Sequence, residues 1–260
     1  MPERITSREN AKIKYACKLG QSAAFRAEEN AFLAEGYKLC LELAKGCPLK
    51  VIYYTCRAQD KWPALQALPC EQYLVEDHVA EKLAGVESPQ GVFGVFGRPA
   101  ARFADLPRGG RFLALERVQD PGNVGALIRS AAAFDFDGVL LSPGCADPFA
   151  PKVLRASMGA AGRMPLVAAP NLADALAELA SRGVLCLAAA LENSLPLGEV
   201  DPACPGGVCL VIGSEGQGLS AAAMAACQKA VRIPITDRVE SLNASVAGGV
   251  LLWHFRGAGR

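Results

Sequence analysis

The sequence lacks several features that define whole classes of proteins. No apolar run reaches the roughly 18 residues that a membrane-spanning helix requires, and the polar start MPERITSRENAKIK does not resemble a signal peptide. Only two histidines occur, His78 and His254, and none of the ten cysteines forms a C-x-x-C pair, so the spacing of zinc ligands is missing. We therefore expect a cytoplasmic protein with free thiols, no metal ion and no membrane contact.

An excess of charge is also missing, because 27 basic residues face 26 acidic ones and the net charge is +1. This balance neither requires nor excludes a nucleic-acid partner, and it hides local patches. One patch lies in residues 1–20, where five cations stand against two carboxylates (Arg4, Arg8, Lys12, Lys14 and Lys18 against Glu3 and Glu9). On charge alone, this pattern indicates the solvated face of a helix.

The sequence does contain a regular alternation of strand-like and helix-like segments. We expect a small α/β domain over residues 1–97, a linker rich in Pro, Gly and Arg over 98–110, and a larger α/β domain over 111–260. In the larger domain the alternation predicts a parallel sheet, with the apolar stretch 207–213 as a strand covered on both faces. Ligands of such sheets bind beyond the carboxyl ends of the strands.

Three polar clusters stand at predicted strand ends, and the first is ERVQDPGNVGALIRS. Asn123 suits the N-cap of the following helix, and Arg129 suits an ordinary surface position of that helix. Gly125 costs a helix about 1 kcal/mol relative to alanine, which indicates that something packs close to the backbone. This stretch alone leaves a structural and a functional interpretation equally open.

The second cluster, LVIGSEGQGLS, joins a buried strand to a glycine-rich turn. Gly213, Gly216 and Gly218 permit unusual backbone angles and close approach of a ligand. The turn lacks the lysine of a P-loop and the G-x-G-x-x-G order of a dinucleotide site, and Glu215 would repel an anion. The pattern favours a neutral or cationic ligand, or else a plain turn with Glu215 near the start of the next helix.

The third cluster lies near the carboxyl end, in IPITDR followed by VESLNASVAGG. Ser241 or Asn243 can cap the terminal helix, which leaves other polar side chains free to reach a site. Gly248 and Gly249 are costly inside a helix, so we expect tight packing there, against another chain or a loop.

With these clusters the chain resembles the SpoU family of RNA 2′-O-methyltransferases, within the SPOUT superfamily. Three motifs match in order: N-x-G-x-x-x-R from Asn123 to Arg129, G-S-E-G-x-G at 213–218, and I-P at 233–234 followed by S-L-N at 241–243. The stretches 5–19, 32–39 and 88–95 look like the substrate-binding domain of many members. Members often have glycine where Asp237 stands, which puts the detail of the cofactor loop in doubt.

The resemblance implies a C-terminal parallel-sheet α/β domain with a trefoil knot, a small α/β RNA-binding domain before it, and a homodimer. It implies S-adenosyl-L-methionine as cofactor and a ribose 2′-hydroxyl as methyl acceptor, with ribosomal RNA favoured over tRNA. The catalytic residues that it implies are Arg129, Asn123, Glu215, Ser241 and Asn243. The cofactor-binding residues are Gly213, Ser214, Gly218, Ile233 and Leu242. The RNA-binding residues are Arg8, Lys12, Lys14 and Arg129.

A guanidinium is a poor general base because its pKa exceeds about 12. We therefore expect Arg129 to bind an RNA phosphate and to stabilise the developing alkoxide, and Glu215 to hold Arg129 or the ribose. Two alternatives are an RNA-binding or assembly protein that has lost catalysis, and a nucleotide-binding α/β enzyme of another class. The five polar motif residues argue against the first, and the missing phosphate-loop signatures argue against the second.

Overall fold

The structure is a computed structural model that describes residues 2–84 and 89–257. Ser88, the first residue of the 88–95 stretch, lies outside the described residues. Contacts divide the chain into two compact units, and the division does not follow the sequence in a single step. Unit 1 comprises Met1–Pro99 and Asp147–Arg163, and unit 2 comprises Ala100–Ala146 and Met164–Arg260.

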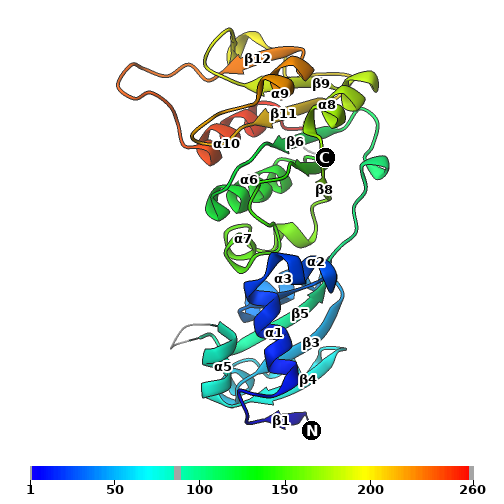
Figure 1. Ribbon diagram of the computed structural model, residues 1–260, viewed down its shortest axis with the longest axis vertical. Coiled ribbons are helices and arrows are strands. Elements are labelled where there is room, and N and C mark those ends of the chain that lie inside the picture. Colours follow the sequence, from blue (N-terminus) through cyan, green and yellow to red (C-terminus); the bar gives the residue numbers. More distant parts are fainter. Residues whose placement is uncertain (1, 85–88, 258–260) are drawn as a thin grey trace. The chain divides into compact units, whose positions relative to one another are not determined.

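Unit 1 is built on a five-stranded mixed sheet in the order β1-β4-β3-β5-β2 (Figure 1). The strands are β1 (Glu3–Ile5), β2 (Ala31–Glu35), β3 (Leu49–Tyr54), β4 (Glu71–Val75) and β5 (Val92–Gly97). The helices are α1 (Ala11–Gln21), α2 (Ala23–Glu28), α3 (Tyr37–Leu43), α4 (Cys56–Lys61) and α5 (Asp77–Ala84), with 3-10 turns at Pro63–Ala67 and Phe103–Asp105, the latter in unit 2. Strand β5 is antiparallel to both β3 and β2, whereas β1, β4 and β3 are parallel.

The core of unit 1 forms where α1 and α5 cover the sheet. Ile13 and Leu19 of α1 and Val79 of α5 share one buried cluster with the stacked rings of Tyr53 and Tyr73. Burial of such side chains contributes on the order of 1.5–3 kcal/mol each. The alternation of apolar residues in the sequence therefore marks the inward face of each of these elements.

The segment Asp147–Arg163 belongs to unit 1, although the sequence places it inside the larger predicted domain. It carries α7 (Pro151–Ala156) and the turn Ala160–Gly162. The Phe149 ring lies 5.0 Å from the Phe32 ring, centroid to centroid, and Arg26 Nε donates to Asp147 Oδ2 at 2.7 Å. The predicted boundaries of 1–97, 98–110 and 111–260 do not anticipate these contacts, because they join residues more than 100 positions apart.

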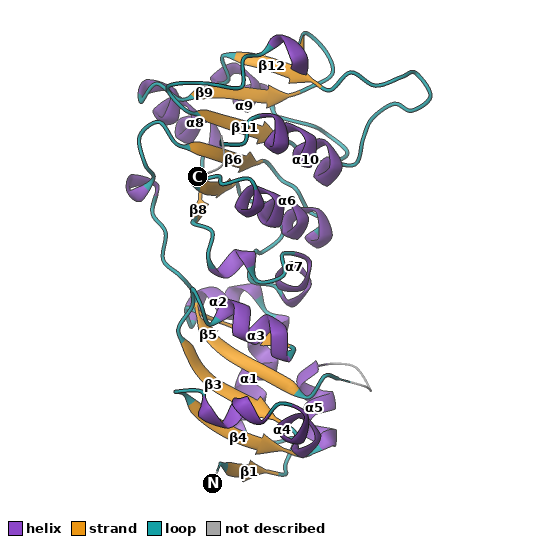
Figure 2. Cartoon of the chain, turned by 180° about the vertical axis from the view of Figure 1, so that it is seen from behind, coloured by secondary structure: helices purple, strands orange, loops and turns teal. Residues whose placement is uncertain are grey.

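Unit 2 has a seven-stranded sheet in the order β10-β12-β9-β11-β6-β7-β8, and every pair in it is parallel (Figure 2). The strands are β6 (Arg111–Leu115), β7 (Gly138–Leu141), β8 (Leu166–Ala168), β9 (Leu185–Ala189), β10 (Leu195–Pro196), β11 (Val208–Ile212) and β12 (Lys229–Arg232). The helices are α6 (Pro121–Ala133), α8 (Leu172–Ser181), α9 (Ala221–Ala226) and α10 (Ala244–His254), with a 3-10 turn at Leu197–Glu199. The α/β class and the parallel sheet are confirmed. Every residue of β11 is buried, as expected for its apolar sequence.

The two glycines of α10 have different surroundings. A Cβ on Gly248 would lie 2.2 Å from Leu127 Cδ2 and 2.7 Å from Ile212 Cδ1, so α10 packs closely on α6 and β11. A Cβ on Gly249 would meet nothing within 4 Å. The predicted tight packing is confirmed at Gly248, where the contacts come from the same chain; at Gly249 the chain itself supplies none, and packing there against another chain stays a prediction.

None of the helices in residues 2–84 and 89–257 is long and apolar enough to cross a membrane.

Candidate functional site

The carboxyl ends of three neighbouring strands and the start of α10 enclose one pocket in unit 2. Its volume is about 400 Å³, within the usual range for small-molecule sites. The lining comes from the end of β9 (Ala189, Ala190, Leu191), the end of β11 and its loop (Ile212, Gly213, Ser214, Glu215, Gly218), the end of β12 (Val231, Arg232, Ile233, Ile235) and α10 with its approach (Ser241, Leu242, Asn243, Ala244, Ala247, Leu251). All five residues predicted to bind the cofactor line this pocket, together with three of the five predicted catalytic residues.

The loop after β11 folds back on itself, and glycine makes this possible. Gly218 N donates to Ser214 O at 2.9 Å, and Gly218 has a φ of +63°, a region that favours glycine. A Cβ on Gly213 would lie 2.3 Å from the carbonyl carbon of Gly218, which is backbone and has no room to move. The pocket wall at this point is therefore bare backbone, against which a flat ligand can lie.

Asn243 has two roles at the entrance of α10. It is the N-cap of the helix, and its Oδ1 accepts from Ser245 N at 2.9 Å and from Ser245 Oγ at 2.7 Å. The amide nitrogen of the same side chain makes no hydrogen bond among the described residues, and Asn243 lines the pocket beside Ser241. The predicted cap is thus confirmed for Asn243, and Ser241 is left for a ligand.

Asn123 is not the N-cap of α6, which corrects one sequence interpretation. The cap is Asp120, whose Oδ1 accepts from Asn123 N at 2.8 Å. Asn123 lies in the first turn of α6, is buried, and donates from Nδ2 to Glu215 Oε1 at 2.6 Å. The first and second motifs, 92 residues apart, therefore meet at this bond. Asp120, which precedes Pro121 and Gly122, has the better cap sequence because proline favours the first helical position.

Glu116 is a site residue that the sequence analysis missed. It is 9% exposed, and its carboxylate accepts from both Ser220 N and Ser220 Oγ at 2.7 Å. Ser220 also caps α9, so Glu116 fixes the far end of the loop that begins at Gly213. The sequence contains a signal for this role: Glu116 directly follows an apolar strand, and a carboxylate buried there needs hydrogen-bond partners to offset its desolvation.

Arg129 lies on α6, is exposed, and has no ion pair or hydrogen bond within residues 2–84 and 89–257. It does not line the pocket, and Glu215 is bonded to Asn123 instead of to Arg129. The predicted contact between Glu215 and Arg129 is therefore absent from the described residues. The guanidinium of Arg129 is therefore available to an anionic partner.

Comparison with known proteins identifies the family. Residues 110–253 match the SpoU rRNA Methylase family, and residues 10–94 match the MRM3-like substrate binding domain. The chain belongs to the SpoU rRNA methylase family. It is 31% identical over 255 residues to the 23S rRNA (guanosine(2553)-2′-O)-methyltransferase RlmP of Bacillus subtilis, which covers 98% of this chain and 100% of that protein.

Solved structures agree with this assignment to the SpoU family. The S-adenosyl-L-methionine-bound rRNA methyltransferase of Sinorhizobium meliloti has a TM-score of 0.85 at 29% identity, covering 97% of both chains. The SpoU methyltransferase AviRb of Streptomyces viridochromogenes, in complex with the same cofactor, has a TM-score of 0.86 at 25% identity, covering 95% of this chain and 97% of that one. As a member of the SpoU family, the chain is an S-adenosyl-L-methionine-dependent RNA 2′-O-ribose methyltransferase.

The pocket fits the cofactor of the SpoU family. Its lining is largely apolar, as an adenosine ring requires, with Ser214, Ser241 and Asn243 as polar partners. Among the described residues that line the pocket, Arg232 is the one lysine or arginine, and its guanidinium donates to the Ser194 carbonyl. The carboxylate of Glu215 would therefore attract the positively charged sulfonium of the cofactor, and no unpaired lysine or arginine of the described lining would repel it.

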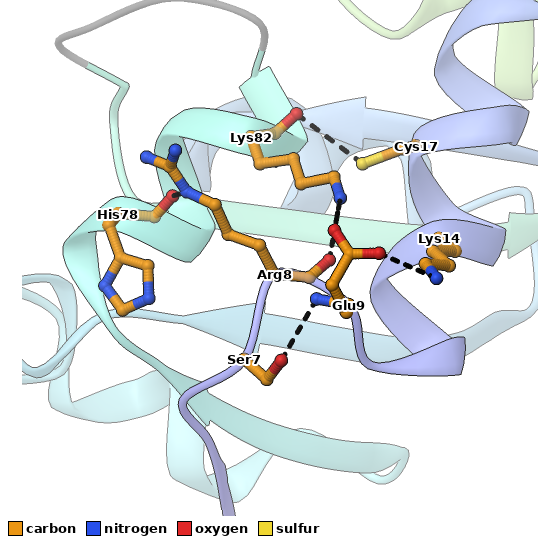
Figure 3. A network of polar contacts seen from close by, with 7 residues as sticks. All are labelled: Ser7, Arg8, Glu9, Lys14, Cys17, His78 and Lys82. Atoms are coloured by element: carbon orange, nitrogen blue, oxygen red, sulfur yellow. Dashed lines mark hydrogen bonds and ion pairs between the residues drawn. The ribbon is translucent and has the colours of Figure 1, made fainter.

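The other predicted RNA contacts of this SpoU protein lie in unit 1 and are ion-paired there. Arg8 contacts Glu81 at 2.9 Å, Lys12 contacts Glu71 at 2.9 Å, and Lys14 contacts Glu9 at 2.7 Å. Figure 3 shows Glu9 between Lys14 and Lys82, with Arg8 turned to the carbonyl of His78. Together these two lysines lower the pKa of Glu9 to about 2, Lys14 contributing most. The role of Arg8, Lys12 and Lys14 in RNA binding stays a prediction.

Proposed function

We propose that the pocket at the strand ends of unit 2 binds S-adenosyl-L-methionine and that the methyl acceptor is a ribose in ribosomal RNA. The observation that carries this proposal is the convergence of all five predicted cofactor residues on one pocket, with Glu215 of that pocket bonded to Asn123. The ribosomal target is supported by the substrate-binding domain at 10–94 and by the likeness to RlmP, whose name specifies 23S rRNA.

When bound, the cofactor supplies an electrophilic methyl group. The acceptor hydroxyl has a pKa far above 7, so the protein must stabilise the oxygen as negative charge develops on it. Arg129 is an exposed guanidinium with no ion pair among the described residues, which suits it to bind the adjacent phosphate and to stabilise the alkoxide. Glu215 Oε1 is held by Asn123, so Oε2 is directed and free to accept a hydrogen bond from the ribose.

We also propose a homodimer formed through α10. Val246, Val250 and Trp253 follow one another at helical spacing on a single face, and they are 52%, 38% and 54% exposed. Exposed apolar side chains gathered on one face mark an interaction surface, and self-association of this face would be symmetric. Sedimentation equilibrium should give twice the monomer mass, and Val250→Asp should give the monomer mass. A monomeric wild-type protein would refute the dimer.

The remaining finer predictions are the trefoil knot and a cytoplasmic location. Family membership supports the knot, since the knot belongs to the SPOUT superfamily that the sequence resembles. The ten free cysteines, five of them buried (Cys17, Cys40, Cys47, Cys186 and Cys209), support a reducing compartment.

Methyl transfer provides the test. Purified protein is incubated with tritiated S-adenosyl-L-methionine and with unmodified ribosomal or transfer RNA, and the modified ribose is mapped. We expect label at one ribose of ribosomal RNA. Arg129→Ala should lower the turnover rate by about 10²–10³-fold with cofactor affinity unchanged, as loss of an oxyanion donor does.

Two variants control this experiment. Arg108→Ala removes an exposed arginine elsewhere in unit 2 and should leave turnover unchanged. Arg129→Lys keeps the charge but loses the planar fork, so it should recover only part of the activity. Full activity of Arg129→Ala would refute its role, and label in tRNA alone would refute the ribosomal target.

A further inference from the structure

The cations of unit 1 differ in whether they pair with a carboxylate within the described residues. Four of the five cations in residues 1–20 are neutralised within the unit, because Arg4, Arg8, Lys12 and Lys14 each contact a carboxylate; the fifth, Lys18, lies over the Phe25 ring. A phosphate that approached this stretch would have to break an ion pair for each new contact. The free cations of unit 1 therefore give a better guide to where a polyanion binds.

Three free cations lie at one edge of the unit 1 sheet, where β2 and β3 end. Lys38 is in the first turn of α3, and Arg57 and Lys61 are on α4, which follows β3 (Figure 2). All three are exposed, and none has an ion pair within the described residues of the chain. We call this region the α4 edge and define it by Tyr37, Lys38, Arg57, Lys61, Trp62 and Gln90.

The α4 edge also has an aromatic platform. The rings of Tyr37 and Trp62 are stacked, with centroids 4.8 Å apart and planes inclined by 10°. Lys61 Nζ lies 4.7 Å from the Trp62 centroid. Trp62 is partly exposed, and Lys61, being exposed and flexible, can leave the ring for another partner. A planar base can take its place, since stacking on an aromatic ring tolerates any base.

A pocket of about 620 Å³ opens beside this platform. It is lined by Thr55, Arg57, Ala58, Lys61, Trp62, Asp77, Ala80, Glu81, Pro89, Gln90 and Gly91. Two of the lining residues are acidic. Glu81 is paired with Arg8, and Asp77 has no ion pair among the described residues. Phosphates would keep to the side of Arg57 and Lys61, away from Asp77, so the charges set the direction of a bound strand.

We propose that the α4 edge is where the N-terminal unit binds a single-stranded segment of RNA, with one unpaired base in this pocket against Trp62. Arg57 and Lys61 contact the phosphates that flank this base. The inference rests on the proposed function, because it assigns a place to an RNA that the methyltransferase must bind. It differs from the sequence-based prediction, which places RNA on Arg8, Lys12 and Lys14.

Equilibrium filter binding to an unmodified ribosomal RNA transcript, at several salt concentrations, tests the proposal. Trp62→Ala should weaken binding by about 5- to 100-fold, the effect of losing one stacked base. Trp62→Phe keeps a ring and should recover most of the affinity. Arg57→Ala should reduce the salt dependence by about one phosphate contact. Lys14→Ala tests the competing site in the basic stretch and should have little effect, because the lysine is paired with Glu9.

Two further measurements separate the possible failures. Thermal unfolding and S-adenosyl-L-methionine binding should match the wild type in all four variants, which shows that loss of RNA binding is not loss of structure. If wild type binds and methylates RNA but Trp62→Ala binds equally well, this inference is overturned and the proposed function stands. If Lys14→Ala weakens binding more than Arg57→Ala, the basic stretch is the RNA site. If wild type binds no RNA, both proposals fail.

Discussion

The two sheets of this protein use their edges in different ways. In unit 2 every strand is parallel, so the carboxyl ends of β9, β11 and β12 meet at one edge and their loops enclose one pocket. Part of the wall of this pocket is the loop backbone at Gly213, which is held by close packing against Gly218. In unit 1 the sheet is mixed and the polar surface consists of exposed side chains, many of them in ion pairs. Unit 2 thus suits chemistry that needs a fixed geometry, and unit 1 suits a binding surface that can adapt to RNA.

The backbone wall is the feature whose loss should have the largest effect. In Gly213→Ala the new Cβ would lie 2.3 Å from the carbonyl carbon of Gly218, so the loop must open. We expect the affinity for S-adenosyl-L-methionine to fall by about 10- to 100-fold, the equivalent of a packing clash of 1–3 kcal/mol. Isothermal titration calorimetry measures it.

Gly216→Ala is the matched control in the same loop, because its Cβ would meet nothing within 4 Å. It should bind the cofactor nearly as well as wild type. Equal affinities of the two variants would show that the loop is flexible and that unit 2 is no more rigid at its site than unit 1.

Packing behind the pocket should have an intermediate effect. Gly248→Ala drives a methyl group into Leu127 and Ile212, both buried, and should lower the free energy of unfolding by about 1–3 kcal/mol. Gly249→Ala, one position further on, meets no atom of its own chain within 4 Å and, in the monomeric Val250→Asp background, should raise it by about 0.5–1 kcal/mol through helix propensity. Urea unfolding of both variants provides the comparison, and a destabilised Gly249→Ala would contradict the described packing of α10.

The exposed ion pairs of unit 1 should have the smallest effect. Glu9 has its pKa lowered to about 2, chiefly by Lys14 and then by Lys82. A lowered pKa stabilises the fold above the ordinary value of 4.5, and the contribution is lost as the pH falls from there toward 2. Lys14→Ala should therefore move the pKa of Glu9 upward, as a carboxyl-detected NMR titration would show.

At neutral pH the same variant should lower the unfolding midpoint only slightly, because the pair is exposed and solvent screens it. Lys38→Ala, which removes an unpaired lysine of unit 1, should leave the pKa of Glu9 unchanged. A clear loss of stability in Lys14→Ala would mean that the surface of unit 1 is held more firmly than this comparison allows.

The sequence sufficed for the features that local residues determine. Apolar runs such as 207–213 predict buried strands, and Asn243 at the start of an apolar stretch predicts a helix cap; both are found. The motif glycines could be assigned to one loop because the requirement at Gly213 is local. These features follow from a few neighbouring positions, so no knowledge of distant contacts was needed.

Features that depend on distant residues were not accessible. Lys12 contacts a carboxylate 59 positions away, so the basic stretch looked free when read alone. Asn123 looked like a cap until its partner Glu215, 92 positions away, was visible. The sequence also offered two candidates for the cap of α6, Asp120 and Asn123, and they lie about one helical turn apart. Sequence patterns indicate that a group is polar, and only the fold shows what it contacts.

The placement of Asp147–Arg163 in unit 1 has a consequence for any attempt to exchange modules between relatives. The chain passes between the units three times, near residues 99, 146 and 163, so the first unit is discontinuous and cannot be cut out at one point. A fragment ending at Pro99 would leave Phe32 without Phe149 and Arg26 without Asp147. A chimera that receives a new RNA-recognition module must therefore receive this inserted stretch with it, because the module's core is completed only by residues 147–163.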